Sequence, residues 1–274
     1  MSQVATPSAV VDLAEIANFA DRVRLNAVRM VAPHGFGYLG QALSSAELIA
    51  TLSLDGYRPG TDQIVCSPGH YIIANFAAAA ETGQLDKELL STYGHDDSTL
   101  EAIGTERSPA VDLTCGSLGT GLSGAVGFAL SNRFNGDEEA RVYVLVSDGE
   151  MEEGQVWEAA MFAAHHQLGR LIVLLDANDS QVDGPVSSIT TIEPIAEKWR
   201  SFGWHAADVD GHDVKALRAA LEDAKASSLP SVIIARTATD HGLDALPEDV
   251  DGHFIKLPAA LADSAVAELE ARLV

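Results

Sequence analysis

Acidic and amide side chains follow two aliphatic runs whose ends lie 30 residues apart. Asp148 comes after RVYVLV (141–146), and Asn178 comes after RLIVLL (170–175). That interval fits one strand–helix–strand unit, whose crossover places the two strands side by side. Ligands of parallel sheets bind beyond the carboxyl ends of the strands, so we expect both side chains at one edge as oxygen ligands for Mg²⁺. Gly149 allows a close turn, after which a helix N-terminus would point N–H groups toward a diphosphate, although a helix cap and a turn residue would also suit Asp148 and Asn178.

The elements that must position these residues alternate between helices and strands. Apolar residues at helical spacing predict helices at 10–31, from 44, after 70, after 121, at 152–168 and at 213–227. Unalternating aliphatic runs predict strands at 62–67, 141–149, 170–178, 203–210 and 230–239. Ser44 and Glu47 have the spacing of a capping box. This alternation predicts an α/β fold, a doubly wound and mainly parallel sheet flanked by helices, with an N-terminal helical arm. No linker is evident, so residues 1–274 are expected to form a single domain.

The charge of the chain excludes some classes of partner. Forty acidic against 17 basic residues give a net charge of −23, which disfavours binding to nucleic acid or to an anionic membrane. The sequence has no apolar run of about 18 residues and no secretory signal pattern, and its two cysteines form no framework. We therefore expect a soluble, cytoplasmic protein that binds an anion only with help from a divalent cation, helix N-termini or another chain.

Four segments resemble the transketolases, a family of thiamine diphosphate enzymes. SDGEMEEGQVWEAAMFAAHHQL followed by LLDANDSQVDG resembles the diphosphate-binding signature of the family. VDLTCGSLGTGLSGAVGFAL (111–130) resembles the loop and helix that cover the cofactor. IVCSPGH (64–70) and LGQALSSAEL (39–48) are similar to two further turns of the family. The resemblance runs from about residue 15 to residue 255, so it predicts a thiamin diphosphate-binding fold.

The resemblance implies roles for particular residues. Asp148, Asn178 and the main-chain carbonyl of Ser180 would bind Mg²⁺, or another divalent cation such as Ca²⁺ or Mn²⁺. Thiamine diphosphate would be bordered by several residues of these motifs: His70, Gly116, Ser117, Leu118, Asp148, Gly149, Glu150 and Asn178. His70 and His253 are the expected catalytic imidazoles. Glu153 and Glu158 match carboxylates that connect paired active sites, where they would titrate as a coupled set. A solvated acidic first turn of a helix is the alternative for Glu153.

The resemblance covers only the first part of a full-length transketolase. The resemblance implies that the pyrimidine-binding and C-terminal domains, and with them the glutamate that activates the cofactor, belong to another chain. The chain is therefore expected to be the N-terminal subunit of a split enzyme. It would be inactive without a C-terminal partner subunit, with which it would form a two-plus-two heterotetramer that acts on a small sugar substrate.

Several positions depart from the pattern of the family. Tyr38 stands where a histidine is usual, the segment 100–109 lacks a second expected histidine, and Ser147 replaces a glycine. His34 is a candidate to compensate, although packing also explains it. For His165 and His166 we favour packing over catalysis, and for Cys115 burial over reactivity. GSLGTG (116–121) is not read as a dinucleotide fingerprint, because no clear strand precedes it and no acidic residue follows at the required distance.

Three alternatives remain open at the level of the sequence. The donor can be a ketose phosphate, a modified sugar or another ketose of specialised biosynthesis, and the acceptor can be an aldehyde or an acyl carrier. The decarboxylating 2-oxo acid dehydrogenases share the metal signature, but segment 111–130 favours a transketolase. A non-catalytic scaffold subunit is the third alternative, which the intact carboxylates disfavour.

Overall fold

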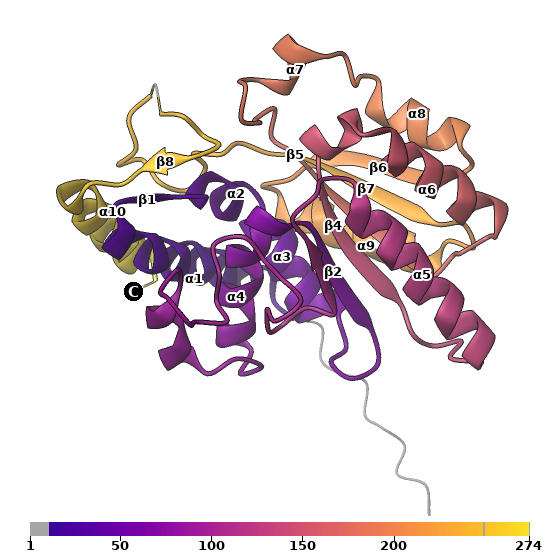
Figure 1. Ribbon diagram of the computed structural model, residues 1–274, viewed down its shortest axis with the longest axis horizontal. Coiled ribbons are helices and arrows are strands. Elements are labelled where there is room, and N and C mark those ends of the chain that lie inside the picture. Colours follow the sequence, from indigo (N-terminus) through magenta and orange to yellow (C-terminus); the bar gives the residue numbers. More distant parts are fainter. Residues whose placement is uncertain (1–10, 249, 274) are drawn as a thin grey trace, which may run out of the picture.

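The computed structural model describes residues 11–248 and 250–273 (Figure 1). Six parallel strands form one sheet in the order β3-β2-β4-β5-β7-β6, and two short antiparallel strands, β1 and β8, form a second sheet. Their bounds are β1 Phe36–Gly37, β2 Gln63–Pro68, β3 Leu113–Cys115, β4 Val142–Ser147, β5 Leu171–Ala177, β6 His205–Asp210, β7 Ser231–Arg236 and β8 Ile255–Lys256. The predicted mainly parallel α/β fold is confirmed.

Helices cover both faces of the main sheet (Figure 1). The helices are α1 Leu13–Val31, α2 Leu39–Ser44, α3 Ala46–Thr51, α4 Ile72–Glu81, α5 Thr120–Asn135, α6 Gly154–His165, α7 Val186–Ile189, α8 Ile195–Ser201, α9 Val214–Ala226 and α10 Ala259–Arg272. Strand β4 shows why helices must pack on both faces of the sheet, because its side chains point alternately into two hydrophobic cores. Tyr143 and Leu145 pack with α1, α3, α4 and α9, whereas Val144 and Val146 pack with α5, α6 and α8. Every residue of β4 is buried, which explains its unalternating aliphatic sequence.

The chain reverses its direction of winding between β2 and β4. From β2 it continues through α4 to the edge strand β3, and from β4 it continues through α6 to β5 on the other side. Ligands of open parallel sheets bind at such a switch point, beyond the carboxyl ends of the strands. The turn after β2, the loop after β3 and the turn after β4 all meet there.

Three local expectations change in the structure. The capping box is wrong, because the Ser44 hydroxyl donates to Asp176 and Glu47 pairs with Arg24. The glycine-rich segment 116–121 does follow a strand, the short β3, which the sequence pattern did not reveal. The expected helical arm is α1, which packs against α3, α4 and α10 and belongs to the core.

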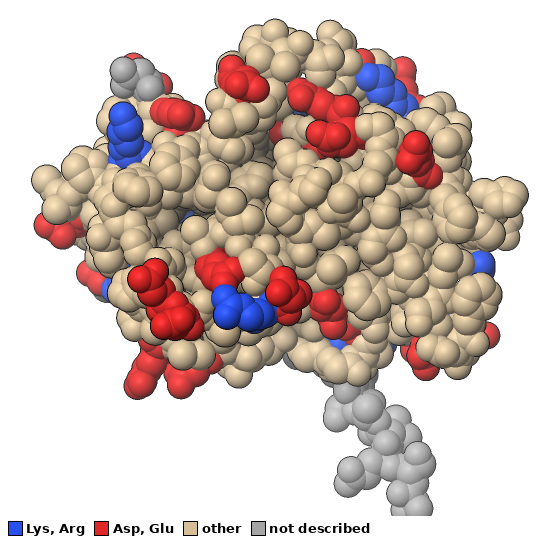
Figure 2. All heavy atoms as spheres, viewed as in Figure 1, with Lys and Arg blue, Asp and Glu red and all other residues tan. Residues whose placement is uncertain are grey.

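The surface reflects the acidic composition of the chain. Acidic side chains are spread over the face seen in Figure 2, where Lys and Arg side chains are few. Among the described residues, none of the helices is both long enough and apolar enough to cross a bilayer.

Candidate active site

The two residues singled out by spacing lie at one edge of the sheet. Ser147 at the end of β4 is in register with Asp176 on β5, so Asp148 and Asn178 follow neighbouring strand ends. Asp148 Oδ2 accepts the N–H of Asp179 at 2.6 Å, and its Oδ1 accepts that of Gly149 at 2.8 Å. Asp148 therefore caps the short helix that begins at Gly149, and each of its oxygens keeps further capacity to accept.

Three carboxylates are buried at this corner. Asp148, Glu150 and Asp176 are at most 2 % exposed, and none takes part in an ion pair among the described residues. Burial, followed by the charge of Asp176, raises the pKa of Asp148 to about 7. Burial also raises the pKa of Asp176, and it raises that of Glu150 to about 7. Negative charge that has no cation in the described chain is what a divalent metal ion would neutralise.

Asp176 is a residue of this corner to which the sequence assigned no role. Its Oδ2 accepts from Ser44 Oγ at 2.6 Å, Asn178 Nδ2 at 2.8 Å and Tyr71 at 3.0 Å, and its Oδ1 accepts from Thr237. These donors come from four different segments, so Asp176 ties them to the end of β5. An aspartate as the next-to-last residue of a fully buried strand was the only signal for this role.

Glu150 points inward rather than into open space. Its Oε1 accepts from Ser67 Oγ at 2.6 Å and from the N–H of Gly119 at 2.7 Å, and its Oε2 accepts from the N–H of Ser147. Glu150 therefore ties the loop after β3 to the ends of β2 and β4. Its expected contact with a cofactor stays a prediction, since three protein donors already occupy the carboxylate.

The loop 116–119 joins β3 to α5 and rests closely on its neighbours. Gly119 has a φ of 80°, and a Cβ there would lie 2.9 Å from the Cβ of Glu153. Gly116 and Ser117 are exposed, and a Cβ at Gly116 would meet nothing within 4 Å. The loop is therefore held at its base and open on one side, as a segment that borders a ligand requires.

A group of aromatic rings lines the side of the site formed by β1 and β8. The ring of His70 lies 5.1 Å from those of both Tyr38 and His253, and Tyr38 lies 5.1 Å from Phe254. Burial, followed by the charge of His253, lowers the pKa of His70 to about 3, and burial lowers that of His253. Both imidazoles are therefore neutral near pH 7, and each can donate one hydrogen bond and accept another.

The histidine-poor segment 100–109 lies beside this group. The N–H of Gly104 donates to the carbonyl of Gly69 at 2.9 Å, and Ile103 packs on Gly69 with 44 % of its surface exposed. Two apolar or aromatic side chains, Tyr38 and Ile103, thus stand around the turn that carries His70.

Glu153 and Glu158 are exposed residues of the first turns of α6, and the charge of Glu153 adds to the effects that raise the pKa of buried Glu150. Glu153 is the N-cap residue of this helix, but its side chain makes no capping hydrogen bond. Their outward direction leaves both available to another chain, and their role stays a prediction.

The remaining histidines named from the sequence lie elsewhere. His34 bonds to the carbonyl of Tyr93 through Nε2 at 2.7 Å. His165 and His166 end α6 near its surface. None of the three joins the rings around His70.

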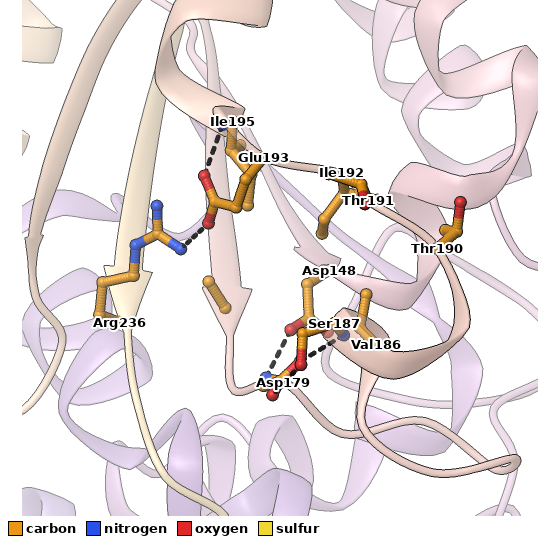
Figure 3. A pocket seen from close by; sticks show the side chains of 11 residues that line it. Asp148, Asp179, Val186, Ser187, Thr190, Thr191, Ile192, Glu193, Ile195 and Arg236 are labelled. Atoms are coloured by element: carbon orange, nitrogen blue, oxygen red, sulfur yellow. Dashed lines mark hydrogen bonds and ion pairs between the residues drawn. The ribbon is translucent and has the colours of Figure 1, made fainter.

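A cavity of about 280 Å³ opens beside Asp148 (Figure 3). Ser187 Oγ donates to Asp179 Oδ2 at 2.8 Å on one side of it. Arg236 lies on the other side, where Glu193 and Asp208 both pair with it. The cavity therefore extends from the corner of buried carboxylates under the segment 186–195, and Arg236, the one cationic residue among the described residues that line it, is already neutralised.

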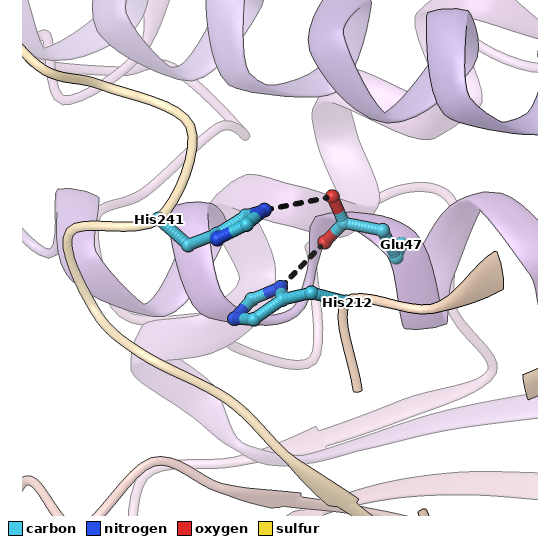
Figure 4. Close-up of side chains that lie close together, drawn as sticks. All are labelled: Glu47, His212 and His241. Atoms are coloured by element: carbon cyan, nitrogen blue, oxygen red, sulfur yellow. Dashed lines mark hydrogen bonds and ion pairs between the residues drawn. The ribbon is translucent and has the colours of Figure 1, made fainter. Parts of the chain in front are cut away.

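A second cluster, Glu47, His212 and His241, has the composition of a metal site (Figure 4). The N–H of Ala238 donates to His212 Nε2 at 2.9 Å, so the neutral ring carries its proton on Nδ1, which lies 3.1 Å from Glu47 Oε2. A metal on Nδ1 would move that proton to Nε2, against a backbone donor. Arg24 Nη2 also lies 2.6 Å from both oxygens of Glu47, so this cluster is an ion-paired support and does not fit a cation.

Comparison with known proteins places these features in a family. The family described as "Transketolase, thiamine diphosphate binding domain" matches residues 17–273. A 6-deoxy-6-sulfo-D-fructose transketolase subunit of Clostridium sp. (strain MSTE9) is 37 % identical over 95 % of this chain and 97 % of its own length. An apulose-4-phosphate transketolase subunit of Actinobacillus succinogenes is 32 % identical over 81 % of this chain and 83 % of its own length.

Full-length enzymes match over part of their length only. Human transketolase is 31 % identical over 93 % of this chain, which covers 42 % of that protein. The crystal structure of transketolase from Campylobacter jejuni superposes with a TM-score of 0.86 at 25 % identity, covering 95 % of this chain and 43 % of that one. The transketolase of Leishmania mexicana gives a TM-score of 0.82 at 27 % identity, with 94 % and 41 % covered.

Proposed function

The chain belongs to the transketolase family through its thiamine diphosphate-binding domain, and we propose that it is the N-terminal subunit of a two-chain transketolase. With a partner subunit, it transfers a two-carbon ketol unit from a ketose or ketose phosphate to an aldehyde acceptor. The bound cofactor supplies the electrophilic carbon and the electron sink, and the protein supplies binding, orientation and a desolvated site. The observation that carries this proposal is the corner of buried carboxylates at the switch point of the sheet, which form no ion pair with Lys, Arg or His among the described residues.

Asp148, Asn178 and the carbonyl of Ser180 hold the divalent cation in this proposal. Support comes from the hard oxygens of the two side chains at neighbouring strand ends and from the raised pKa of Asp148. Mg²⁺ is the expected ion, with Ca²⁺ or Mn²⁺ as substitutes. Gly149 and the open loop Gly116–Leu118 border the cofactor.

His70 and His253 act on the substrate side. Their neutral rings lie 5.1 Å apart, so each can hydrogen-bond to an oxygen of a bound ketose without carrying charge. Around the same turn, Tyr38 and Ile103 supply a phenol and an aliphatic side chain instead of further imidazoles. A modified sugar is therefore as good a candidate donor as a ketose phosphate, and the printed names of two relatives include a sulfo-sugar and apulose 4-phosphate. An acyl carrier acceptor is the alternative.

The partner carries the pyrimidine-binding and C-terminal domains. Residues 1–274 form one domain in this proposal, since the chain covers about the first two-fifths of full-length transketolases and nearly the whole of relatives named as subunits. Exposed Glu153 and Glu158 face the second copy of the site in a two-plus-two heterotetramer. A cytoplasmic location agrees with the free cysteines Cys66 and Cys115.

Titration calorimetry with thiamine diphosphate and Mg²⁺ tests the proposal, with this chain alone and together with the partner. We expect tight binding in the complex and at least about 100-fold weaker binding for Asp148→Ala, because a ligand of the metal is lost. Asp183→Ala, in the exposed loop nearby, is the matched control and should bind as the wild type does.

A panel of ketose donors, assayed with the same complex, then identifies the substrate. Failure of the wild-type complex to bind the cofactor would overturn the enzymatic proposal and favour a scaffold subunit. Full turnover by this chain alone would overturn the requirement for a partner.

A further inference from the structure

Gln41 on α2 reaches the backbone and the ring of His253, 212 residues later in the chain. Its side chain is 1 % exposed. The amide nitrogen lies 2.9 Å from the carbonyl oxygen of His253 and 3.2 Å from the Nδ1 of the same residue. The side-chain amide of Gln41 thus contacts both the main chain and the ring of His253, the residue that we place on the substrate side.

The carbonyl contact decides which way the amide of Gln41 points. A carbonyl oxygen can only accept, so the atom 2.9 Å away is the NH₂ group and not the amide oxygen. The NH₂ group also faces Nδ1 of His253, which must then accept. A neutral imidazole that accepts at Nδ1 carries its proton on Nε2.

The backbone around His253 holds the ring in this contact. A Cβ at Gly40, next to Gln41, would lie 1.9 Å from the carbonyl oxygen of Gly252, so the two segments touch through glycine. The N–H of His253 donates to Asp251 Oδ1 at 3.0 Å. With Nδ1 accepting from Gln41, the proton of the neutral ring lies on Nε2, which is left to donate to a ligand.

We propose that Gln41 is a positioning residue that fixes His253 as an Nε2–H donor on the substrate side of the site, which it shares with His70. The inference rests on the proposed function, because it assigns His253 a ketose hydroxyl or carbonyl as its hydrogen-bond acceptor. His70 provides the contrast within the same group of rings. No hydrogen bond to its ring is found among residues 11–248 and 250–273, so its proton is free to occupy either nitrogen.

Nitrogen-detected NMR of the full chain labelled with ¹⁵N-histidine tests the proposal without cofactor or partner. His253→Gln and His70→Gln assign the two rings. We expect a protonated Nε2 and an unprotonated Nδ1 for His253, and averaged tautomers for His70. A proton on Nδ1 of wild-type His253 would overturn the proposal, and this result needs no variant at position 41.

Two variants at position 41 add a direct test. Gln41→Leu removes the donor and should give averaged tautomers at His253, whereas Gln41→Glu offers an acceptor and should move the proton to Nδ1. Gln84→Leu, at an exposed glutamine, is the control. Unchanged His253 signals in folded Gln41→Leu and Gln41→Glu would also overturn the assignment.

In the complex with its partner, Gln41→Leu should lower kcat roughly 10-fold with little change in KM. A His253 ring whose N–H points away from the substrate oxygen would slow the reaction more than it would weaken substrate binding. An unchanged kcat, combined with the expected NMR result, would overturn the link to catalysis and leave the tautomer assignment standing. Failure of the proposed function itself would appear separately, as a wild-type complex without activity.

Discussion

Glu47 on α3 and Asp148 after β4 are both buried carboxylates, but one contacts an arginine and the other has no cation among the described residues. Burial alone would raise the pKa of Glu47, yet hydrogen bonds from His212 and Arg24 and the charge of Arg24 lower it. At Asp148, burial and the charge of Asp176 raise the pKa to about 7. A carboxylate whose countercharge is supplied within the fold supports structure, whereas one without it is suited to an ion from solution.

The largest effect should come from removing the countercharge of Glu47. We expect Arg24→Leu to lower the free energy of unfolding by about 3–5 kcal/mol, because it leaves a buried carboxylate uncompensated. Urea denaturation measures the change. Arg29→Leu is the matched control, since Arg29 pairs with Glu270 at a half-exposed site and should cost less than about 1 kcal/mol. An equal loss of unfolding free energy in the two variants would show that the buried position of Glu47 does not make its countercharge more important than that of an exposed ion pair.

At Asp148, the loss of the buried charge is expected to change stability in the opposite direction. The folded-state pKa of Asp148 lies above its unfolded value, so its contribution to stability is full below about pH 4 and is lost as the pH rises through about 7. In EDTA at pH 8, Asp148→Asn should raise the free energy of unfolding by about 1–2 kcal/mol. A pKa difference of about three units corresponds to roughly 4 kcal/mol, but the single amide oxygen of Asn can accept only one of the two N–H groups that Asp148 binds, which offsets part of the gain. The gain should shrink toward pH 4.

Glu47→Gln is the counterpart of that variant. The folded-state pKa of Glu47 is lowered, so its contribution is present above the unfolded pKa and is lost as the pH falls through the lowered value. Glu47→Gln should therefore destabilise the protein at pH 8. Denaturation curves that move in the same direction for both variants would contradict the comparison.

The smallest effect should come from His241. Its ring stacks on His212 with centroids 3.5 Å apart, and its Nε2 lies 3.7 Å from Glu47, but its side chain is 42 % exposed. We expect His241→Ala to cost less than about 1 kcal/mol, because Arg24 already compensates Glu47 and an exposed pair contributes little. A loss as large as that of Arg24→Leu, measured by the same denaturation, would show that the imidazoles provide the countercharge.

The sequence predicts the sheet and the meeting of Asp148 and Asn178 at its edge because both follow from local patterns. Fully buried parallel strands need unbroken aliphatic runs, and a single crossover brings Asp148 and Asn178 to neighbouring strand ends. Asp176 and Gln41 were missed because decisive partners lie far away in the chain: Ser44 is 132 residues from Asp176, and His253 is 212 residues from Gln41. The capping box predicted from the spacing of Ser44 and Glu47 was wrong for the same reason. Ser44 bonds to Asp176 and Glu47 pairs with Arg24, and neither side chain caps a helix.

The pairing of β1 with β8 also determines when each part of the site can form. Asp148 bonds to Asp179 across 31 residues, whereas Phe36 pairs with Lys256 across about 220. Closing the longer loop costs about 1.7 kcal/mol more chain entropy, and a growing chain cannot attempt it until β8 has been synthesised. We therefore expect folding to follow a fixed order, in which the contact of Asp148 with Asp179 forms early and the ring of His253 is placed last.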